Sequence, residues 1–385
     1  MKKSLAQFVP SRRNSLKQKR SAIKAFYNFV FFLLQFCAIC PFTISNETNI
    51  VWKIWKHISR MMNILLQILM VLDLIIIIAS WDVFRFLSVS IVTIRLIFVL
   101  FRWNISYRWT HLNRIRRIMC SSSFSGQNTS TLNVYSIYAW AVISSLSYFL
   151  SAVVTINTSK DEIIRFEHVF GSPINNSELR LMLRILYSWY HEMLMISPLN
   201  TFNVFYIMIA YQIRCKLKTF PKHFSSRTKL DYDKLLRSYV SIKSLVDELD
   251  DELSCLMFGN IVYTSGFIHF ILSIDLSTVL RNDYDVVFFW CSLARNLGSY
   301  VAATASASLV AKASEEIGNL AQIRAKIDKD AFSLLAQQTF IMISEKEMHF
   351  TAWKIVPIKK SFFMATIGVT VTYVLLLDNV ESNKF

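Results

Sequence analysis

Residues 345–385 decide the fold class of this chain, and they read EKEMHFTAWKIVPIKKSFFMATIGVTVTYVLLLDNVESNKF. A polar segment ends at Lys360, and an uncharged, mostly apolar run follows over residues 361–377. Asp378 ends this run close to the last residue. About 20 apolar residues cross the hydrocarbon core of a bilayer as a helix. We therefore predict that the last helix spans a membrane.

The composition extends this prediction to the rest of the chain. Of its 385 residues, 54% are hydrophobic and 18% are charged, whereas soluble domains carry about 45–50% apolar and about 25% charged residues. Glycine and proline are few, at 7 and 6 copies, so few breaks interrupt the apolar runs. In lipid, a helix satisfies all its backbone hydrogen bonds within one segment. The sequence thus predicts an all-α membrane protein.

Seven apolar stretches are long enough to span a membrane. They lie at residues 58–80, 86–103, 134–156, 183–213, 258–280, 286–311 and 357–377. A further apolar segment, 26–44, is broken near its end by Pro41. This segment could cross the membrane or form a re-entrant helix at its surface, and the distribution of charge favours the re-entrant helix.

Lysine and arginine are distributed unevenly between the loops. The segments before the first span, after the second, after the fourth and before the seventh are rich in basic residues, whereas the other loops hold few. Basic residues stay on the cytoplasmic side of a membrane. This distribution predicts an inverted topology, with the N-terminus inside and the C-terminus outside. It also accounts for the net charge of +16 without nucleic-acid binding, for which no motif is present.

These predictions divide the chain into seven segments. They are a cytoplasmic N-terminus with a re-entrant or interfacial helix (1–57, helix 26–44), the first four transmembrane helices (58–213), a cytosolic helical linker (214–257), the fifth and sixth helices (258–311), a cytosolic helical segment (312–356), the seventh helix (357–380) and an extracellular tail (381–385). In both cytosolic segments, apolar residues recur every three or four positions between charges. This period is typical of amphipathic helices, so we expect the later helices to extend into the cytosol and pack together there.

No group of residues predicts catalysis, a cofactor or a metal. The 7 histidines are scattered, and no nucleotide-binding loop is present. Cys37 and Cys40 have the spacing of a metal or redox pair, but they lack a second pair and are more readily explained as packing residues. We expect no enzymatic activity.

Two short motifs lie near the C-terminus. Thr372 and Tyr373 begin an apolar run, and Phe350, Thr351 and Ala352 precede them. Together with the Pro-Phe pair at residues 41–42, these motifs resemble the arthropod gustatory receptor family of the insect chemoreceptor superfamily, which is related to odorant receptors. The signature of that family is Thr-Tyr, an apolar run and then Gln-Phe in the last helix, and a Phe-Thr-Ala segment commonly precedes it.

The sequence also departs from the family pattern. Asp378 cuts the apolar run short, and Asn379 and Val380 stand where the family has Gln-Phe. Trp353 and Lys354 stand where a glycine usually follows Phe-Thr-Ala. The resemblance therefore does not predict the ion selectivity.

The resemblance implies a ligand-gated, nonselective cation channel of the plasma membrane that acts as a taste receptor. It implies a tetramer, either of this chain alone or with related subunits, whose last helices line one pore. The pore and gate residues would then be Thr372, Leu375, Leu376, Asp378, Asn379 and Val380. A ring of apolar side chains gates by excluding water, and a ring of carboxylates concentrates cations. Asp378 could instead only end the helix, Asn379 could only cap it, and Tyr373 is expected to pack against a neighbouring helix.

Aromatic and polar residues in the predicted outer halves of the helices suggest where a small tastant, such as a sugar or an alkaloid, would bind. The candidates are Tyr148, Tyr187, Trp189, Tyr190, Glu192, His269 and Trp290. Aromatic residues in membrane helices are more often packing residues or membrane-interface anchors, and each of these could be one. An ionisable residue inside a span needs a partner that stabilises its charge. The ionisable residues inside the predicted spans are Asp73, Arg95, His191, Glu192, Asp275 and Arg295. A non-channel membrane receptor or transporter that signals through cytosolic partners remains the alternative.

Overall fold

The computed structural model describes most of the helical part of the chain. The described residues are 24–25, 27–31, 33, 50–79, 86–120, 178–179, 182, 196–221, 231–272, 283–327, 334–362, 364–369 and 372. The helices are α2 (Ile50–Ala79), α3 (Phe86–Tyr107), α4 (Trp109–Cys120), α8 (Ser197–Leu217), α10 (Tyr232–Leu272), α12 (Asp283–Ile327) and α13 (Leu334–Glu345). Two short strands, β1 (Thr351–Ala352) and β2 (Val356–Pro357), form one antiparallel hairpin. The predicted helical architecture is confirmed.

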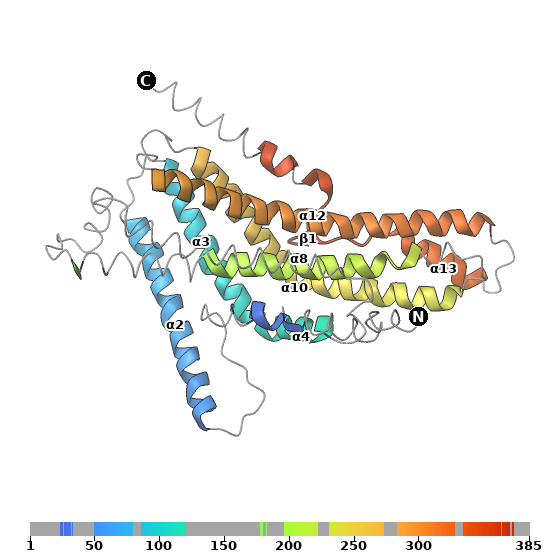
Figure 1. Cartoon of the computed structure of the whole chain (residues 1–385), viewed down its shortest axis with the longest axis horizontal. Coiled ribbons are helices and arrows are strands. Elements are labelled where there is room, and N and C mark those ends of the chain that lie inside the picture. Colours follow the sequence, from blue (N-terminus) through green and yellow to red (C-terminus); the bar gives the residue numbers. More distant parts are fainter. Residues whose placement is uncertain are drawn as a thin grey trace, which may run out of the picture.

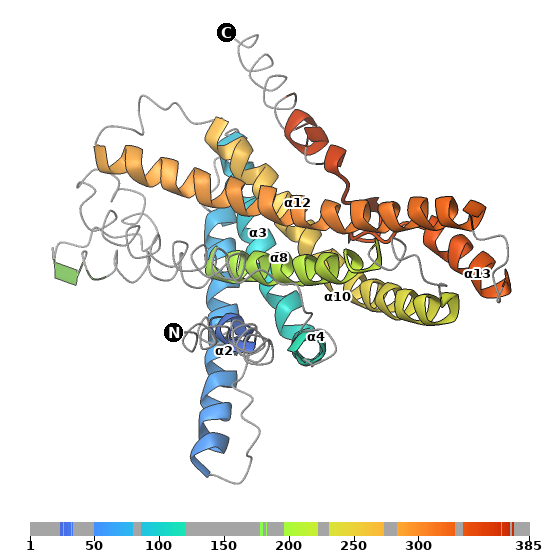
Figure 2. The ribbon, with the colours of Figure 1, turned by 45° about the vertical axis from the view of Figure 1, so that its right-hand side comes forward.

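Three long helices form the body of the molecule. The helices α8 and α12 lie along each other, and α10 runs beside them (Figure 1). The helix α3 packs on α10, α4 continues from α3, and α13 folds back against both α12 and α10. The helix α2 contacts α3 and projects away from the rest of the bundle in both views (Figure 2).

The helix α8 lies in the core. Every residue from Ser197 to Ala210 is buried except Ile207. A helix without a polar face has no side that favours water, so it is stable only where neighbours surround it. The core of the described structure is therefore built around α8, between α12 and α10.

The helix α10 is amphipathic over its first half. Its buried residues recur every three or four positions, at Leu235, Tyr239, Ile242, Val246, Leu249 and Leu253. The charged residues between them face outward or reach neighbouring helices. This periodicity is the one that the sequence shows, and the helix itself continues without a break to Leu272.

Small residues allow α12 to approach its neighbours closely. Ala303, Ala307 and Ser314 are fully buried on this helix. The Ser314 hydroxyl lies 3.0 Å from the Tyr239 hydroxyl of α10 and accepts a hydrogen bond of 2.9 Å from the Met348 N–H. It therefore joins α10, α12 and the segment that leads to the hairpin.

None of the helices, over the residues that are described, combines the length and the low polarity that a membrane span requires. The predicted span 134–156 lies outside the described residues, and 58–80, 183–213, 258–280 and 357–377 are described only in part. The number of spans and their orientation stay predictions.

Candidate functional site at the hairpin before the last helix

The β1–β2 hairpin joins α13 to the last helical segment. Its strands pair Thr351 with Pro357 and Ala352 with Val356. The Ile358 N–H donates to the Phe350 carbonyl at 2.8 Å, which closes the base of the hairpin. Helical backbone resumes at Lys360, so the position of the hairpin sets where the last helix begins.

One face of α10 holds the hairpin. Asp250 accepts two hydrogen bonds from Thr351, one from its N–H and one from its hydroxyl, each of 2.6 Å. The Trp353 N–H donates to the Ser254 carbonyl at 3.0 Å. The Trp353 ring lies on Phe258, with ring centroids 4.7 Å apart. Asp250, Ser254 and Phe258 are four residues apart and thus lie on one face of the helix.

The turn of the hairpin has an unusual backbone. Trp353 and Lys354 have φ values of 52° and 58°, in the left-handed region. Glycine adopts this region without a steric penalty, whereas a side chain there costs on the order of 1–2 kcal/mol per residue. These are the two residues that stand where the gustatory receptor family commonly has a glycine. Contacts with α10 hold them in place, including an ion pair of 2.5 Å between Lys354 Nζ and Asp251 Oδ1.

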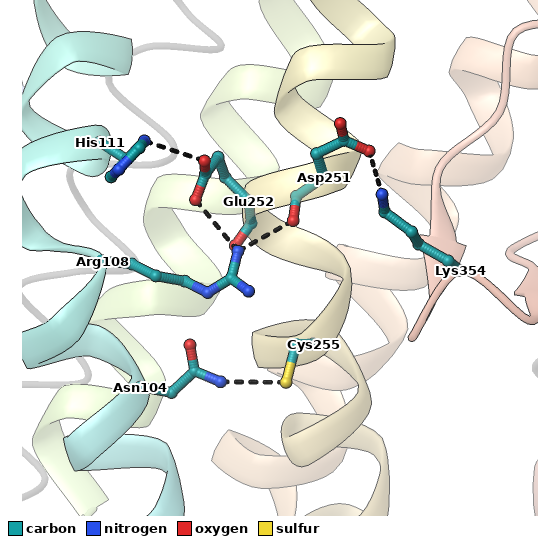
Figure 3. Close-up of polar contacts among 7 residues, drawn as sticks. All are labelled: Asn104, Arg108, His111, Asp251, Glu252, Cys255 and Lys354. Carbon is teal, nitrogen blue, oxygen red and sulfur yellow. Dashed lines mark hydrogen bonds and ion pairs between the residues drawn. The ribbon is translucent and has the colours of Figure 1, made fainter.

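The other side of the same α10 turn binds α3 and α4 (Figure 3). Arg108, which lies between those helices, donates to Glu252 Oε2 at 3.0 Å and to the backbone carbonyls of Asp251 and Glu252 at 2.9 and 3.2 Å. His111 Nδ1 lies 2.9 Å from Glu252 Oε1. The Asn104 side-chain amide donates to Cys255 Sγ at 3.0 Å.

A single stretch of α10, residues 250–255, therefore binds the hairpin on one side and α3 and α4 on the other. We call it the 250–255 segment. Asp251 itself contacts both sides, since its side chain pairs with Lys354 and its carbonyl accepts from Arg108. The 250–255 segment, about one and a half turns of helix, thus lies between α3 and α4 on one side and the hairpin before the last helix on the other.

The electrostatics of the segment follow from its partial burial. Desolvation raises the pKa of the Asp250 carboxyl, and the hydrogen bonds from Thr351 offset only part of that rise. The hydrogen bond to Asp251 raises the pKa of the Lys354 ammonium. Burial therefore disfavours the ionised form of the Asp250 carboxyl, whereas the contact with Asp251 favours the charged form of Lys354.

The Arg108–Glu252 pair is expected to contribute a measurable coupling. Its side chains are 25% and 19% exposed, so a double-mutant cycle of Arg108→Gln and Glu252→Gln should give a coupling free energy of about 1 kcal/mol in thermal unfolding. Arg114 and Glu248 form a more exposed pair at 3.2 Å, and the same cycle on that pair serves as the control. Equal coupling in the two cycles would contradict a special role for Arg108.

The Phe-Thr-Ala motif at residues 350–352 lies at the start of the hairpin. Phe350 is fully buried against Tyr206 of α8, with ring centroids 5.4 Å apart, and Thr351 and Ala352 form β1. Thr372 is helical and exposed. Trp290 of α12 is 57% exposed, and His269 lies in α10.

The other predicted pore and ligand residues lie outside the described part of the chain. They are Tyr148, Tyr187, Trp189, Tyr190, Glu192, Tyr373, Leu375, Leu376, Asp378, Asn379 and Val380. Their roles stay predictions. Of the ionisable residues expected inside spans, Arg95 and Arg295 are buried, with 8% and 6% of their surface exposed.

Sequence reasoning missed the residues of the 250–255 segment. It treated the acidic run DELDDE at 247–252 only as the polar face of a helix. The available signal was the complementary basic run from Arg108 to Arg117, which has no acidic residue. Among the described residues, no three histidine, cysteine, aspartate or glutamate side chains are placed to hold a metal ion.

The fold of the chain as a whole is that of an insect olfactory receptor. The structure is similar to that of the olfactory receptor OR5 from Machilis hrabei, with a TM-score of 0.65 and 11% sequence identity over 93% of this chain and 98% of that chain. The similarity to the same receptor in complex with eugenol has a TM-score of 0.64, with 12% identity over 94% and 99% of the two chains. No protein-family model and no curated protein matches the sequence. At these identities, the likeness shows the fold alone.

Proposed function

We propose that this chain is a ligand-gated cation channel of the insect chemoreceptor type. The observation that carries the proposal is the likeness to an olfactory receptor over nearly the full length of both chains. The C-terminal motifs, found independently in the sequence, support the same superfamily. The proposal includes no enzymatic step and no cofactor.

The ligand is proposed to be a small organic molecule. Olfactory receptor OR5 was solved in complex with eugenol, and this chain shares its fold. The Thr-Tyr and Phe-Thr-Ala motifs favour a gustatory role within the superfamily. We therefore place sugars, alkaloids and small phenols among the compounds to test.

The finer features of the proposal come from the sequence. The chain would lie in the plasma membrane with its N-terminus in the cytoplasm, as the distribution of basic residues favours. Four copies, or this chain with related subunits, would surround a pore lined by the last helix. Leu375, Leu376 and Val380 would gate it by excluding water, and Asp378 would concentrate cations at the outer mouth.

The hairpin suggests how ligand binding would reach the pore. The last helix starts directly after β2, and the hairpin is held by Asp250, Asp251 and Ser254 of α10. A ligand that shifts α3 or α10 would move this attachment. Opening would then follow from the preference of the ligand for one position of these helices over another.

Whole-cell recording tests the proposal. Cells that express the full chain should show a nonselective cation current that is evoked by one of the compounds and persists when G-protein signalling is blocked. Asp378→Asn should change the conductance or the block by calcium. Normal surface expression with no evoked current, or a response that needs G proteins, would favour a non-channel receptor or a transporter instead.

A further inference from the structure

Three buried amides and a hydroxyl lie on α8, α10 and α12, and the amide of α8 donates hydrogen bonds to groups of α10 and α12. They belong to Asn203 of α8, Asn260 of α10, and Asn296 and Ser299 of α12, and we call them the buried amide cluster. Their exposed fractions are between 1% and 3%. The Asn203 side-chain N–H₂ donates to Asn260 Oδ1 at 3.1 Å and to Ser299 Oγ at 3.4 Å. Asn296 lies one turn before Ser299 and therefore on the same face of α12.

Several polar atoms of this cluster have no partner among the described residues. Asn203 Oδ1 accepts no hydrogen bond, and both Oδ1 and Nδ2 of Asn296 lack partners. Exchanging the oxygen and nitrogen ends of the carboxamides moves the unpartnered atom of Asn203 but does not remove it, and Asn296 stays unpartnered in either orientation. The cluster thus presents three polar atoms that its own residues do not satisfy, and they include an acceptor and a donor in either orientation.

Leaving these groups unpaired is costly. A buried polar group without a hydrogen bond has a higher free energy than the same group in water. Folded proteins therefore pair nearly all buried polar groups with other protein atoms or with ordered water molecules. The unpaired atoms include both acceptors and a donor, which matches a hydroxyl, since a hydroxyl donates one hydrogen bond and accepts others. No residue of the cluster is charged, so the cluster itself offers no counter-charge to a buried charged guest.

We propose that the buried amide cluster is a binding site for a small neutral molecule that presents a hydroxyl group to Asn203 and Asn296. Two sources supply this chemistry, namely a water molecule and the hydroxyl of a bound organic molecule. The inference depends on the fold and not on channel activity.

The cluster lies close to the hairpin. Tyr206 follows Asn203 by one turn of α8 and contacts Phe350, which directly precedes β1. A guest at the cluster is therefore one helical turn from a residue that packs on the hairpin. If the proposed channel is correct, occupancy of this site would bear on the attachment of the last helix.

The sign of a stability change tests the proposal. Asn296→Leu is nearly isosteric and removes both unpaired groups. If the cluster holds a guest, this change expels it and lowers the thermal midpoint of the purified full chain by about 2–4 °C. If the cluster is empty, the same change removes an uncompensated polar group and raises the midpoint, which would overturn the proposal. Asn319→Leu, at an exposed position of the same helix, is the matched control and should leave the midpoint unchanged.

A double-mutant cycle separates a shared guest from ordinary packing. Asn203→Leu also removes the hydrogen bonds to Asn260 and Ser299, so it carries a cost of its own. If one guest bridges both amides, the loss in the double variant should be smaller than the sum of the two single losses, because either change alone already expels the guest. Additive losses would contradict the proposal. An electron-cryomicroscopy map of the unaltered chain keeps the proposal testable if the variants fail to fold. Density is expected between Asn203 and Asn296, and its absence in a map that shows other ordered waters would overturn the proposal.

A matched pair of probes distinguishes the two sources. Benzyl alcohol should raise the thermal midpoint of the unaltered chain, and benzyl methyl ether should not, if an organic hydroxyl occupies the site. This difference should disappear in Asn296→Leu. If neither probe changes the midpoint while the density is present, the guest is water. These outcomes do not depend on any current, so failure of the channel proposal and failure of this one are distinguishable.

Discussion

Gly318→Leu is expected to separate α13 from α12 and to lower the free energy of unfolding by about 3 kcal/mol. A Cβ atom at Gly318 would lie 2.8 Å from the Ser344 carbonyl oxygen of α13, closer than side-chain carbons approach backbone oxygens. The obstructing atom belongs to the backbone of a helix, so no side chain can rotate away. One of the two helices must move, and the segment that leads to the hairpin must move with it.

The thermal midpoint of the purified full chain measures this effect. Gly368→Ala is the control, because a Cβ atom there would meet nothing within 4 Å. Alanine also has a higher helix propensity than glycine. The control is expected to leave the midpoint unchanged or raise it slightly. A Gly318→Leu variant that is as stable as the control would show that α12 and α13 do not approach this closely in solution.

Asp250→Leu is expected to release the hairpin from α10, at a cost of about 2 kcal/mol to stability. The change removes both hydrogen bonds from Thr351 and leaves the Thr351 N–H without that acceptor. In the proposed channel, it should reduce or abolish the ligand-evoked current at normal surface expression. Asp247→Leu, at an exposed site one turn earlier on α10, is the control and should retain the current.

A milder variant separates the loss of charge from the loss of the contact. Asp250→Asn keeps one acceptor oxygen for Thr351 and should retain more stability than Asp250→Leu. Burial raises the Asp250 pKa above its usual range, so the folded chain holds this proton to a higher pH than the unfolded chain does. The contribution of Asp250 to stability should therefore fall as pH rises from about 4 through the raised pKa. Asp250→Asn should remove this part of the pH dependence, and an unchanged pH profile would contradict the assignment.

The parts of the fold that sequence periodicity governs could be predicted. The helical architecture follows from long apolar runs with few glycines and prolines, and the buried positions of α10 follow from a spacing of three and four. The hairpin could not be predicted in this way. Its strands have two residues each, and its turn places Trp353 and Lys354 in a backbone conformation that neither residue prefers.

The candidate site depends on contacts between distant parts of the sequence. Thr351 binds Asp250 across 101 residues, and Arg108 binds Glu252 across 144. The types of these residues suggest ion pairs, but the identity of each partner depends on how the helices pack. The Phe-Thr-Ala motif was noted through resemblance alone, and the structure gives it a physical role in anchoring the hairpin.

The left-handed turn at Trp353 and Lys354 makes the hairpin's attachment cooperative. Its backbone is unfavourable in isolation, and the contacts of the indole, the ammonium group and Thr351 with α10 offset that cost. Losing one of these contacts removes part of the energy that keeps the turn in shape, and relaxation of the turn then displaces the others. The hairpin would therefore dissociate from α10 in one cooperative step. A small, gradual displacement of α10 would then produce an abrupt change in position at the start of the last helix.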